Sequence, residues 1–186
     1  MPGQIKIDDG AGNYTILTNA GSLGSDKTIT IPNTTGTMAL TSDSFGKVLQ
    51  VVQGTYSTAT TITSTSYTDT NLTASITPSA TSSKILVIVQ HNTQQYRTVG
   101  TVDAIIQLLR DATQIRTNNQ FLEVGGGTSI TFRNNPVILC LDTPSTTSSI
   151  TYKTQAKIFN TSSSHSIATS ANNLTDTITL IEIDGT

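Results

Sequence analysis

The chain has 186 residues and a formal net charge of −2, and 12% of its residues are charged, about half the usual share. A charge so close to zero argues against nucleic-acid binding, which needs clustered Lys and Arg, and no apolar run reaches the ~18 residues that span a membrane. Ser and Thr together supply 57 residues. Because Thr favours half-buried pleated surfaces, this composition predicts an all-β protein with a neutral polar surface.

The N-terminus and the single cysteine narrow the possibilities further. Residues 1–4 are not a basic region followed by an apolar stretch, so the sequence predicts no secretory signal. Cys140 stands alone in the apolar run 137–141. We expect it to be a small buried hydrophobic residue, and we expect no disulfide to stabilise the fold.

Residues 1–44 form a segment of their own in the sequence. Apolar and polar residues alternate at 5–7, a Gly-rich turn follows, and extended structure resumes at 14–17, which predicts a hairpin. Further short strands are expected at 28–31 and 38–40. So few apolar residues cannot build a core, and a two-stranded ribbon is marginal in water. We therefore expect a β-rich stalk or anchor that packs on copies of itself or on a partner.

The most apolar run, residues 83–90, predicts a central strand. Five consecutive apolar residues place apolar side chains on both faces of a strand, so both faces must be covered. Residues 102–109 fit helical and strand spacing alike, and the turn-like sequence at 110–113 after them favours a hairpin. About eight strands are expected in total, at 48–53, 67–76, 84–90, 102–109, 114–116, 129–141, 150–159 and 177–183. The sixth restarts after the glycines at 125–127 with residues 129–132 and contains a second buried run at 137–141. Antiparallel strands in two sheets predict a jelly-roll β-sandwich for residues 45–186.

Strand parity predicts how the two ends of this sandwich differ. If every strand crosses the full height, alternate connections lie at the same end. The short connections share one end with the stalk and the C-terminus, and these are 77–83, 110–113 and 142–148. The long connections crown the other end, and these are 54–66, 91–100, 117–128 and 160–173. Long loops on a rigid scaffold are where recognition is usually found.

The candidate binding residues lie in two of these crown loops. Tyr and Arg carry much of the energy of interfaces, so we select Gln94, Gln95, Tyr96 and Arg97 in the first loop and His165 in the last. His91 and His165 are the only histidines. We expect both to be exposed polar residues, although three copies of one His on a threefold axis could bind a metal ion.

The chemistry of an enzyme is missing from the sequence. The carboxylates are scattered and form no evident acid and nucleophile pair, and the common nucleophile, phosphate-binding and zinc motifs are absent. We therefore predict no catalytic residue, no metal ligand and no cofactor. Glu182, in the last apolar strand, either pairs with Lys or Arg at a subunit interface or faces water.

Several segments of the chain resemble bacteriophage proteins. Residues 26–43, which read DKTITIPNTTGTMALTSD, resemble a short segment of many phage tail-fibre and virion-appendage proteins, where it lies between a stalk and a distal domain. GKVLQVV at 46–52, SSKILV at 82–87, LRDATQI at 109–115 and LIEI at 180–183 are similar to phage fibre-tip domains. Those tips resemble the C1q and tumour-necrosis-factor jelly roll, which is a trimer. The resemblance covers most of the chain and implies a homotrimer.

The resulting hypothesis is a structural protein of the phage particle, a trimeric fibre or spike. Residues 1–44 would join other virion proteins, and the crown would attach to a host receptor, a cell-surface glycan or a protein, with no nucleic acid and no membrane insertion. One alternative is a capsid decoration or head fibre without a receptor role. A glycan-cleaving spike is another. The sequence leaves open the receptor, the host and whether the protein sits on the tail or the capsid.

Overall fold

The computed structural model describes residues 5–8, 11, 14–17, 47–100, 104–118, 128–159 and 164–185. The chain divides into two units, Met1–Asp43 and Ser44–Thr186, where the sequence analysis placed a boundary between residues 44 and 45. In the first unit, β1 (Ile5–Asp8) pairs antiparallel with β2 (Tyr14–Leu17), which confirms the expected hairpin. The strands expected at 28–31 and 38–40 lie outside the described residues. No helix in the described part of the chain is long and apolar enough to cross a bilayer.

The described residues of the second unit form strands and one short 3₁₀ helix. In chain order they are β3 (Val48–Tyr56), β4 (Thr60–Ile62), β5 (Thr68–Ile76), β6 (Lys84–Gln90), β7 (Thr93–Arg97), β8 (Ala104–Arg110), β9 (Thr113–Asn118), β10 (Ile130–Asn134), β11 (Val137–Asp142), β12 (Ile150–Ile158), β13 (Ser166–Thr169), η1 (Ala171–Asn173) and β14 (Asp176–Ile183). They form three antiparallel sheets: a proximal sheet in the order β11-β6-β14-β3, a distal sheet in the order β10-β7-β13-β4, and a facing sheet in the order β5-β12-β8-β9.

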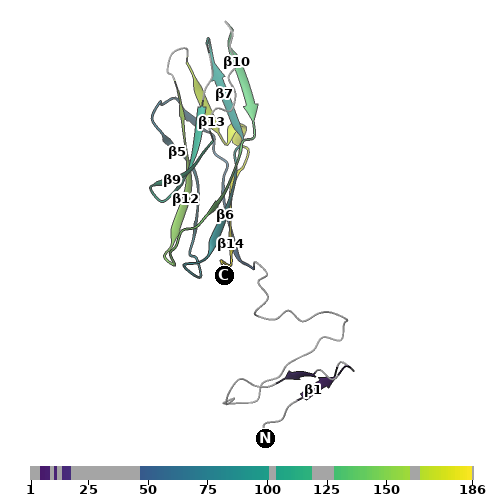
Figure 1. Ribbon diagram of the computed structural model, residues 1–186. Coiled ribbons are helices and arrows are strands. Elements are labelled where there is room, and N and C mark those ends of the chain that lie inside the picture. Colours follow the sequence, from purple (N-terminus) through teal and green to yellow (C-terminus); the bar gives the residue numbers. More distant parts are fainter. Residues whose placement is uncertain are drawn as a thin grey trace. The chain divides into compact units, whose positions relative to one another are not determined.

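The strand pairs are nested like those of a jelly roll (Figure 1). Among the eight longer strands, the first pairs with the last, β3 with β14, the second with the seventh, β5 with β12, and the third with the sixth, β6 with β11. The two middle strands, β8 and β9, form the hairpin predicted at 110–113. This nesting is what a long hairpin gives when it folds over on itself into two sheets. The predicted all-β antiparallel sandwich is therefore confirmed.

The distal sheet is where the structure departs from the sequence analysis. Four strand paths are interrupted at one level, by residues 57–59, 91–92, 135–136 and by η1, and pair again beyond the interruption as β4, β7, β10 and β13. The predicted long loops at 54–66, 91–100 and 160–173 were therefore wrong in part, since each contains a strand. Thr-rich sequence has high strand propensity even without an apolar face, and here pairing with neighbours decides the conformation.

The core fills the space between the facing sheet and the proximal sheet and extends under the distal sheet through Ile62 and Ile167. Inward-pointing residues alternate with outward-pointing ones, as in β12, where every second residue from Ile150 to Ile158 is buried. On β6, Ile85, Val87 and Val89 are fully buried, which confirms that this strand is central. Cys140 was expected to be buried but is half-buried against the edge of the core. Its partial burial, with Asp142 nearby, raises the pKa of its thiol.

One end of the second unit gathers the entry and the exit of the chain. The Asp184 N–H donates to the Lys47 carbonyl over 2.9 Å, and a Cβ added to Gly185 would lie 1.7 Å from the carbonyl oxygen of Ser82. The short connection at 77–83 therefore meets both chain ends. This confirms that the connection at 77–83 and the C-terminal end share one end of the second unit, and the distal sheet lies at the opposite one (Figure 1).

Glu182 fastens the same end from inside. Its side chain is fully buried and accepts hydrogen bonds from the Gln50 amide over 2.5 Å and the Ser79 N–H over 2.6 Å. Burial raises the pKa of Glu182, but the nearby Ser83 hydroxyl and the hydrogen bonds from Gln50 and Ser79 outweigh it and hold the pKa below its ordinary value. Both predictions for Glu182, an intersubunit ion pair or contact with water, were wrong, because these donors come from its own chain.

Candidate functional site

The four predicted binding residues at 94–97 lie on a strand and not in a loop. β7 pairs with β10 on one side and with β13 on the other, so its side chains alternate between the two faces of the distal sheet. Gln95 and Arg97 point inward and are each 1% exposed, whereas Tyr96 points outward and is 37% exposed. The structure therefore leaves Gln94 and Tyr96 as the members of this set that solvent reaches.

The outward side chains of the distal sheet form a polar surface, which we call the distal face. Tyr96 lies between Thr131 on β10 and Ser166 on β13. One step along the strands, Gln94 lies beside Arg133 and accepts a hydrogen bond from its Nε over 2.9 Å. Hydroxyls, an amide and a guanidinium around one exposed aromatic ring are groups that suit hydrogen bonding to a polar partner.

Both histidines are buried, so the expectation that they are exposed was wrong. His165 is 4% exposed, and one of its ring nitrogens lies 3.2 Å from the Val99 carbonyl oxygen. His91 is fully buried, at the level where β6 ends and β7 begins. No group of three or more His, Cys, Asp or Glu side chains that could hold a metal ion occurs among the residues that the structure describes.

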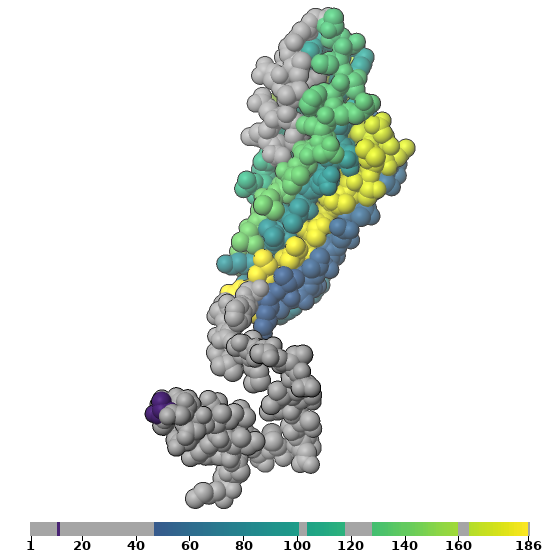
Figure 2. All heavy atoms as spheres, turned by 90° about the vertical axis from the view of Figure 1, so that its right-hand side faces the viewer, coloured from purple at the N-terminus to yellow at the C-terminus, as the bar shows by residue number. Residues whose placement is uncertain are grey.

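The outer side of the proximal sheet is apolar, in contrast to the distal face. Its four strands run as bands across Figure 2, β3 in blue, β14 in yellow, β6 in teal and β11 in green. The register aligns side chains in rows across these bands. We call this surface the proximal face, and its apolar members are Val51, Leu86, Ile88, Val137, Leu139, Leu141, Ile181 and Ile183. Four of them are more than half exposed, namely Val51 at 59%, Leu139 at 57%, Leu141 at 56% and Val137 at 55%.

On the proximal face, a single chain does not provide the cover that the sequence predicts for both faces of the strand at 83–90. The run at 83–90 predicted a strand covered on both faces. The inward residues of β6 are covered, but Leu86 and Ile88 on the other side are only partly buried, and nothing in the described chain lies over them. An apolar surface that continues across four strands is unusual for a monomer and marks an interaction surface.

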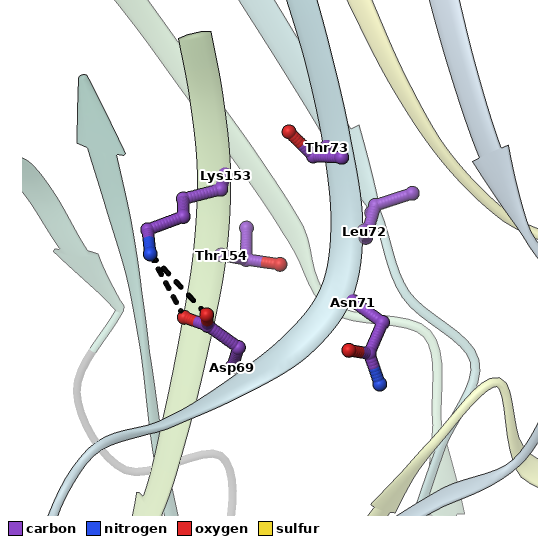
Figure 3. A pocket seen from close by; sticks show the side chains of 6 residues that line it. All are labelled: Asp69, Asn71, Leu72, Thr73, Lys153 and Thr154. Atoms are coloured by element: carbon purple, nitrogen blue, oxygen red, sulfur yellow. Dashed lines mark hydrogen bonds and ion pairs between the residues drawn. The ribbon is translucent and has the colours of Figure 1, made fainter. Parts of the chain in front are cut away.

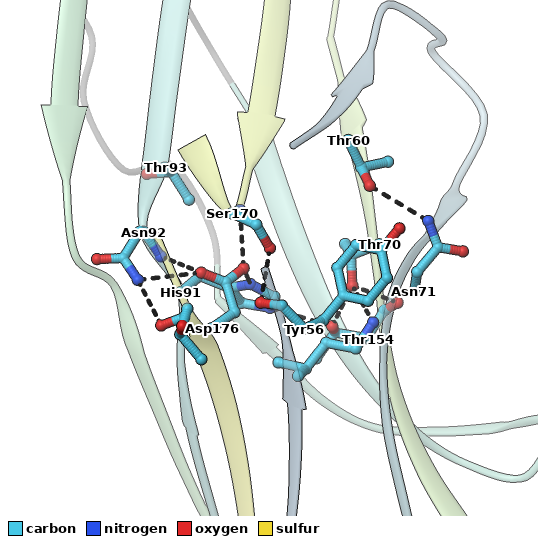
Figure 4. A network of polar contacts seen from close by, with 12 residues as sticks. Tyr56, Thr60, Thr70, Asn71, His91, Asn92, Thr93, Thr154, Ser170 and Asp176 are labelled. Atoms are coloured by element: carbon cyan, nitrogen blue, oxygen red, sulfur yellow. Dashed lines mark hydrogen bonds and ion pairs between the residues drawn. The ribbon is translucent and has the colours of Figure 1, made fainter. Parts of the chain in front are cut away.

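A buried chain of polar groups crosses the sandwich where the proximal and distal sheets meet (Figure 4). His91 Nδ1 lies 2.5 Å from an Asp176 oxygen, and His91 Nε2 lies 3.0 Å from the Thr154 hydroxyl. That hydroxyl lies 2.5 Å from the Thr70 hydroxyl on β5. All four side chains are at most 1% exposed. The buried chain of polar groups therefore links β14 and the end of β6 in one layer to β12 and β5 in the other.

Asp176 also accepts hydrogen bonds from backbone groups that are not part of this buried chain of polar groups. The backbone N–H groups of Asn92 and Ser170 donate to its two oxygens over 2.7 Å and 2.9 Å. Burial raises the pKa of Asp176, but the His91 contact and these N–H groups outweigh burial and hold the pKa below its ordinary value. The carboxylate is thus satisfied inside the fold, as a buried charge must be.

The order carboxylate, imidazole, hydroxyl is also the order of a catalytic triad. A nucleophile must reach a substrate, and Thr154 is 0% exposed, with its hydroxyl already bound to Thr70 and His91. The arrangement therefore serves as a structural link between the layers. Sequence reasoning missed it because His91 is separated from its two partners by 63 and 85 positions, and no local signal joins them.

A pocket of about 220 Å³ opens on the facing sheet beside β5 (Figure 3). Its walls come from β5 and β12, and the lining residues are Asp69, Asn71, Leu72, Thr73, Lys153 and Thr154. Lys153 forms an ion pair with Asp69 at 3.1 Å, and the Gln155 amide donates to the same carboxylate over 2.7 Å. The Gln155 hydrogen bond is the main reason that the pKa of Asp69 is lowered. Sequence reasoning did not select any of these residues.

Comparisons with known proteins add only distant likenesses. No family model and no curated protein matches the chain. Among solved structures it is similar to the insecticidal delta-endotoxin Cry8Ea1 from Bacillus thuringiensis, with 13% identity and a TM-score of 0.32 over 68% of this chain and 20% of that one. It is also similar to the structure of infectious bursal disease virus Gt strain, with 17% identity and a TM-score of 0.30 over 94% of this chain and 45% of that one. The chain spans less than half the length of either protein, and a likeness of this size carries no functional argument.

Proposed function

We propose that the chain is a structural protein of a virus particle that assembles as a homotrimer and presents its distal face to a host surface. The observation that carries the proposal is the uncovered apolar proximal face. Burying this face against a partner removes apolar surface from water, which is favourable by about 25 cal/mol per Å². The partner we assign to it is a second and third copy of the same chain.

Two features favour copies of this chain over an unrelated partner. Lys84, at the margin of the proximal face, is the one charged side chain that the described register aligns with it, so identical copies meet without opposing like charges across the face. The net charge of −2 also gives little repulsion between chains. The number three comes from the resemblance of the sequence to trimeric phage fibre tips.

The position of the chain ends supports the orientation. Lys47 and Asp184 lie together at one end, and the distal sheet lies at the other. If residues 1–44 form the stalk or anchor and join other virion proteins, the distal face points away from the particle. Tyr96, Gln94 and Arg133 then meet a host glycan or protein, and three copies multiply weak contacts.

Two alternatives make different predictions. A capsid decoration or head fibre would also form trimers but would not need the distal face for attachment. A glycan-cleaving spike needs a free acid and a second carboxylate. In the described residues the buried carboxylates, Asp176 and Glu182, are already committed to the groups named above, and the partly buried Asp142 accepts hydrogen bonds from Arg110 and Tyr152. This favours a protein without enzymatic activity.

The mass of the purified protein in solution tests the proposal. Light scattering should give about 59 kDa, three times the 19.6 kDa of one chain. Leu139→Asp places a charge on the proximal face, on edge strand β11 beside Ile88 of β6, and should give monomers. Val99→Asp is the matched control, because Val99 is 50% exposed but lies outside that face, and it should leave the mass unchanged. A monomeric wild-type protein, or a Leu139→Asp variant that stays trimeric, would contradict the proposal.

A further inference from the structure

We propose that the pocket beside β5 is a binding site for an uncharged sugar. It lies on the facing sheet, away from both the distal and proximal faces. The inference extends the proposed host-surface function to a second place on the molecule, but it stands on the geometry of the pocket and does not require the trimer.

The pocket exists because β5 carries extra residues. Between Asp69 and Thr73 β5 advances four positions, while β12 advances two between Gln155 and Lys153. The two extra residues push β5 outward and open the space between the strands. Bulges on an edge strand often re-aim side chains beside functional sites.

The bulge is held rigidly in one conformation. Asn71 has a φ of 67°, a left-handed conformation that Asn adopts more readily than most residues. Its amide nitrogen donates to the Thr60 hydroxyl over 3.2 Å, and the neighbouring Thr70 is fixed to Thr154 by its hydroxyl. A binding group that is already ordered loses little entropy when a ligand arrives.

The lining offers donors and acceptors in equal measure. An ionised carboxylate accepts about four hydrogen bonds, and Asp69 uses its oxygens for Lys153 and Gln155 with room for one hydroxyl more. Among the described residues, the Asn71 carbonyl oxygen and its second amide proton have no partner. Lys153 has a third ammonium proton to give. A ligand rich in hydroxyls, each of which donates and accepts, satisfies this set.

The charges in the pocket favour an uncharged ligand. Lys153 and Asp69 neutralise each other at 3.1 Å, so an acidic or basic ligand would have to compete with an existing ion pair. The volume of about 220 Å³ lies below the ~300–1,000 Å³ of typical ligand pockets. This is room for one pyranose ring, not for a folded peptide, and the bulge also interrupts the straight edge that an added β-strand would need.

An aromatic platform lies next to the pocket on the same side of the sheet. The Lys157 ammonium lies 4.6 Å from the ring centre of Tyr67 and 5.8 Å from that of Phe159. Tyr67 precedes Asp69 by two residues, which is about 7 Å along a strand. A second sugar of a chain that starts in the pocket would therefore reach these rings, whose amphipathic faces suit it.

Saturation-transfer and titration NMR of the full chain would test the site. The probes are the methyl glycosides of glucose, galactose, mannose and N-acetylglucosamine, and the charged comparators are the uronic acid and the 2-amino sugar with the same ring configuration as each of them. At least one neutral glycoside should bind with a dissociation constant of about 1 mM, which is typical for a ligand of this size. The charged analogue of the same sugar should bind at least about tenfold more weakly, since it must disturb the ion pair.

Two variants with matched controls separate binding from folding. Asn71→Gly keeps the left-handed backbone and removes the side-chain amide. Its control is Ser145→Gly, which also removes a polar side chain at a left-handed residue, with a φ of 53°, in the turn at 142–148. Lys153→Gln removes the ammonium group, with Lys47→Gln as its control. Each pocket variant should lower the affinity about tenfold, the loss of one hydrogen bond to a charged or fixed group, while the controls leave it unchanged. Melting temperatures measured alongside check that all four variants fold.

The outcomes are decisive in each direction. If none of the four glycosides binds, or if Asn71→Gly binds as well as Ser145→Gly does, the inference is wrong. The same holds if the charged analogues bind as tightly as the neutral sugars. A trimer that binds no sugar would refute this inference alone, and a monomer that binds one would refute the trimer and leave the site standing.

Discussion

The proximal and distal sheets are two halves of one layer, built from the same four strand paths, yet their side chains follow opposite rules. In the proximal half, β6 is apolar on both sides, with Val87 buried inside and Leu86 partly exposed outside. In the distal half, its continuation β7 is polar on both sides, with Gln95 buried inside and Tyr96 outside. The layer therefore changes chemistry at the level of His91, where all four strand paths are interrupted before they pair again.

The difference indicates that the proximal and distal halves of the layer have different roles. An apolar outer face requires a cover, and a polar one remains in water. Assembly is thus expected to use the proximal half and recognition the distal half, with the buried chain from Asp176 to Thr70 tying both to the facing sheet. Each prediction below tests one side of this contrast, in order of decreasing effect.

Removing the charge at the junction should have the largest effect on stability. Asp176→Asn keeps the shape but leaves His91 and two N–H donors without the carboxylate that they surround. Breaking a buried pair in this way typically costs about 3 kcal/mol or more. Urea unfolding at pH 7 and a fixed protein concentration measures it. Asp69→Asn is the control, because its ion pair is exposed and contributes little. Equal losses in the two variants would contradict the role of the junction.

Acid should weaken the fold through the same group. Asp176 and Glu182 both have a pKa below the ordinary values of 3.8 and 4.5. The unfolded chain therefore binds protons at a higher pH than the folded chain, and stability falls as the pH drops below those values. Thermal unfolding between pH 3 and pH 7 should show this decline, and Asp176→Asn should show a shallower one. A stability that is flat down to pH 3 would contradict the pKa directions.

How much of the fold the sequence could predict depends on which segments carry apolar runs or apolar–polar alternation. The strands of the proximal and facing sheets were predictable, because residues 84–90 and 150–159 carry apolar runs or strict alternation. β7 was not, because Thr93–Arg97 has no apolar residue except the ring of Tyr96, and Gln and Arg favour no particular conformation strongly. Its strand conformation comes from pairing with β10, whose residues lie about 40 positions later, as in the Thr93 and Asn134 contact with a separation of 41.

The candidate sites were hidden for a related reason. A histidine in a polar stretch gives no sign of a partner 85 positions away, so His91 was expected in water. The pocket depends on a bulge, and a bulge is a mismatch in register between two strands that neither strand reveals alone. The proximal face was visible in part, since the run at 83–90 demanded cover on both sides and the chain itself supplies only one.

The inside of the distal half should tolerate an apolar substitution. Gln95 is buried between Phe132 and Ile167, and neither polar atom of its amide has a hydrogen-bond partner. An unsatisfied buried amide costs about 1–3 kcal/mol, so Gln95→Leu should raise the free energy of unfolding by about 1 kcal/mol. Gln94→Leu, on the outward side of the same strand, is the control and should change it by less than about 0.5 kcal/mol. A loss of stability in Gln95→Leu would mean that the amide has a role in the fold.

The smallest effect on stability is expected on the outer face of the distal sheet, at Tyr96. This substitution gives the sharpest test of the contrast between the proximal and distal sheets. Tyr96 and Leu139 are both exposed in the single chain, at 37% and 57%, and both lie on outer faces of the same layer. Tyr96→Ala should change the melting temperature little, because exposed side chains away from special features contribute within about 0.5 kcal/mol. It should also leave the trimer intact on dilution. Leu139→Ala removes a side chain of the proposed interface in every subunit, and losses above about 1 kcal/mol are usual for interface residues that contribute strongly. Its trimer should dissociate at concentrations at least about tenfold higher, as light scattering across a dilution series would show.

If Tyr96→Ala loosens the trimer as much as Leu139→Ala does, the distal face is part of the assembly surface, and recognition has to be sought elsewhere on the head.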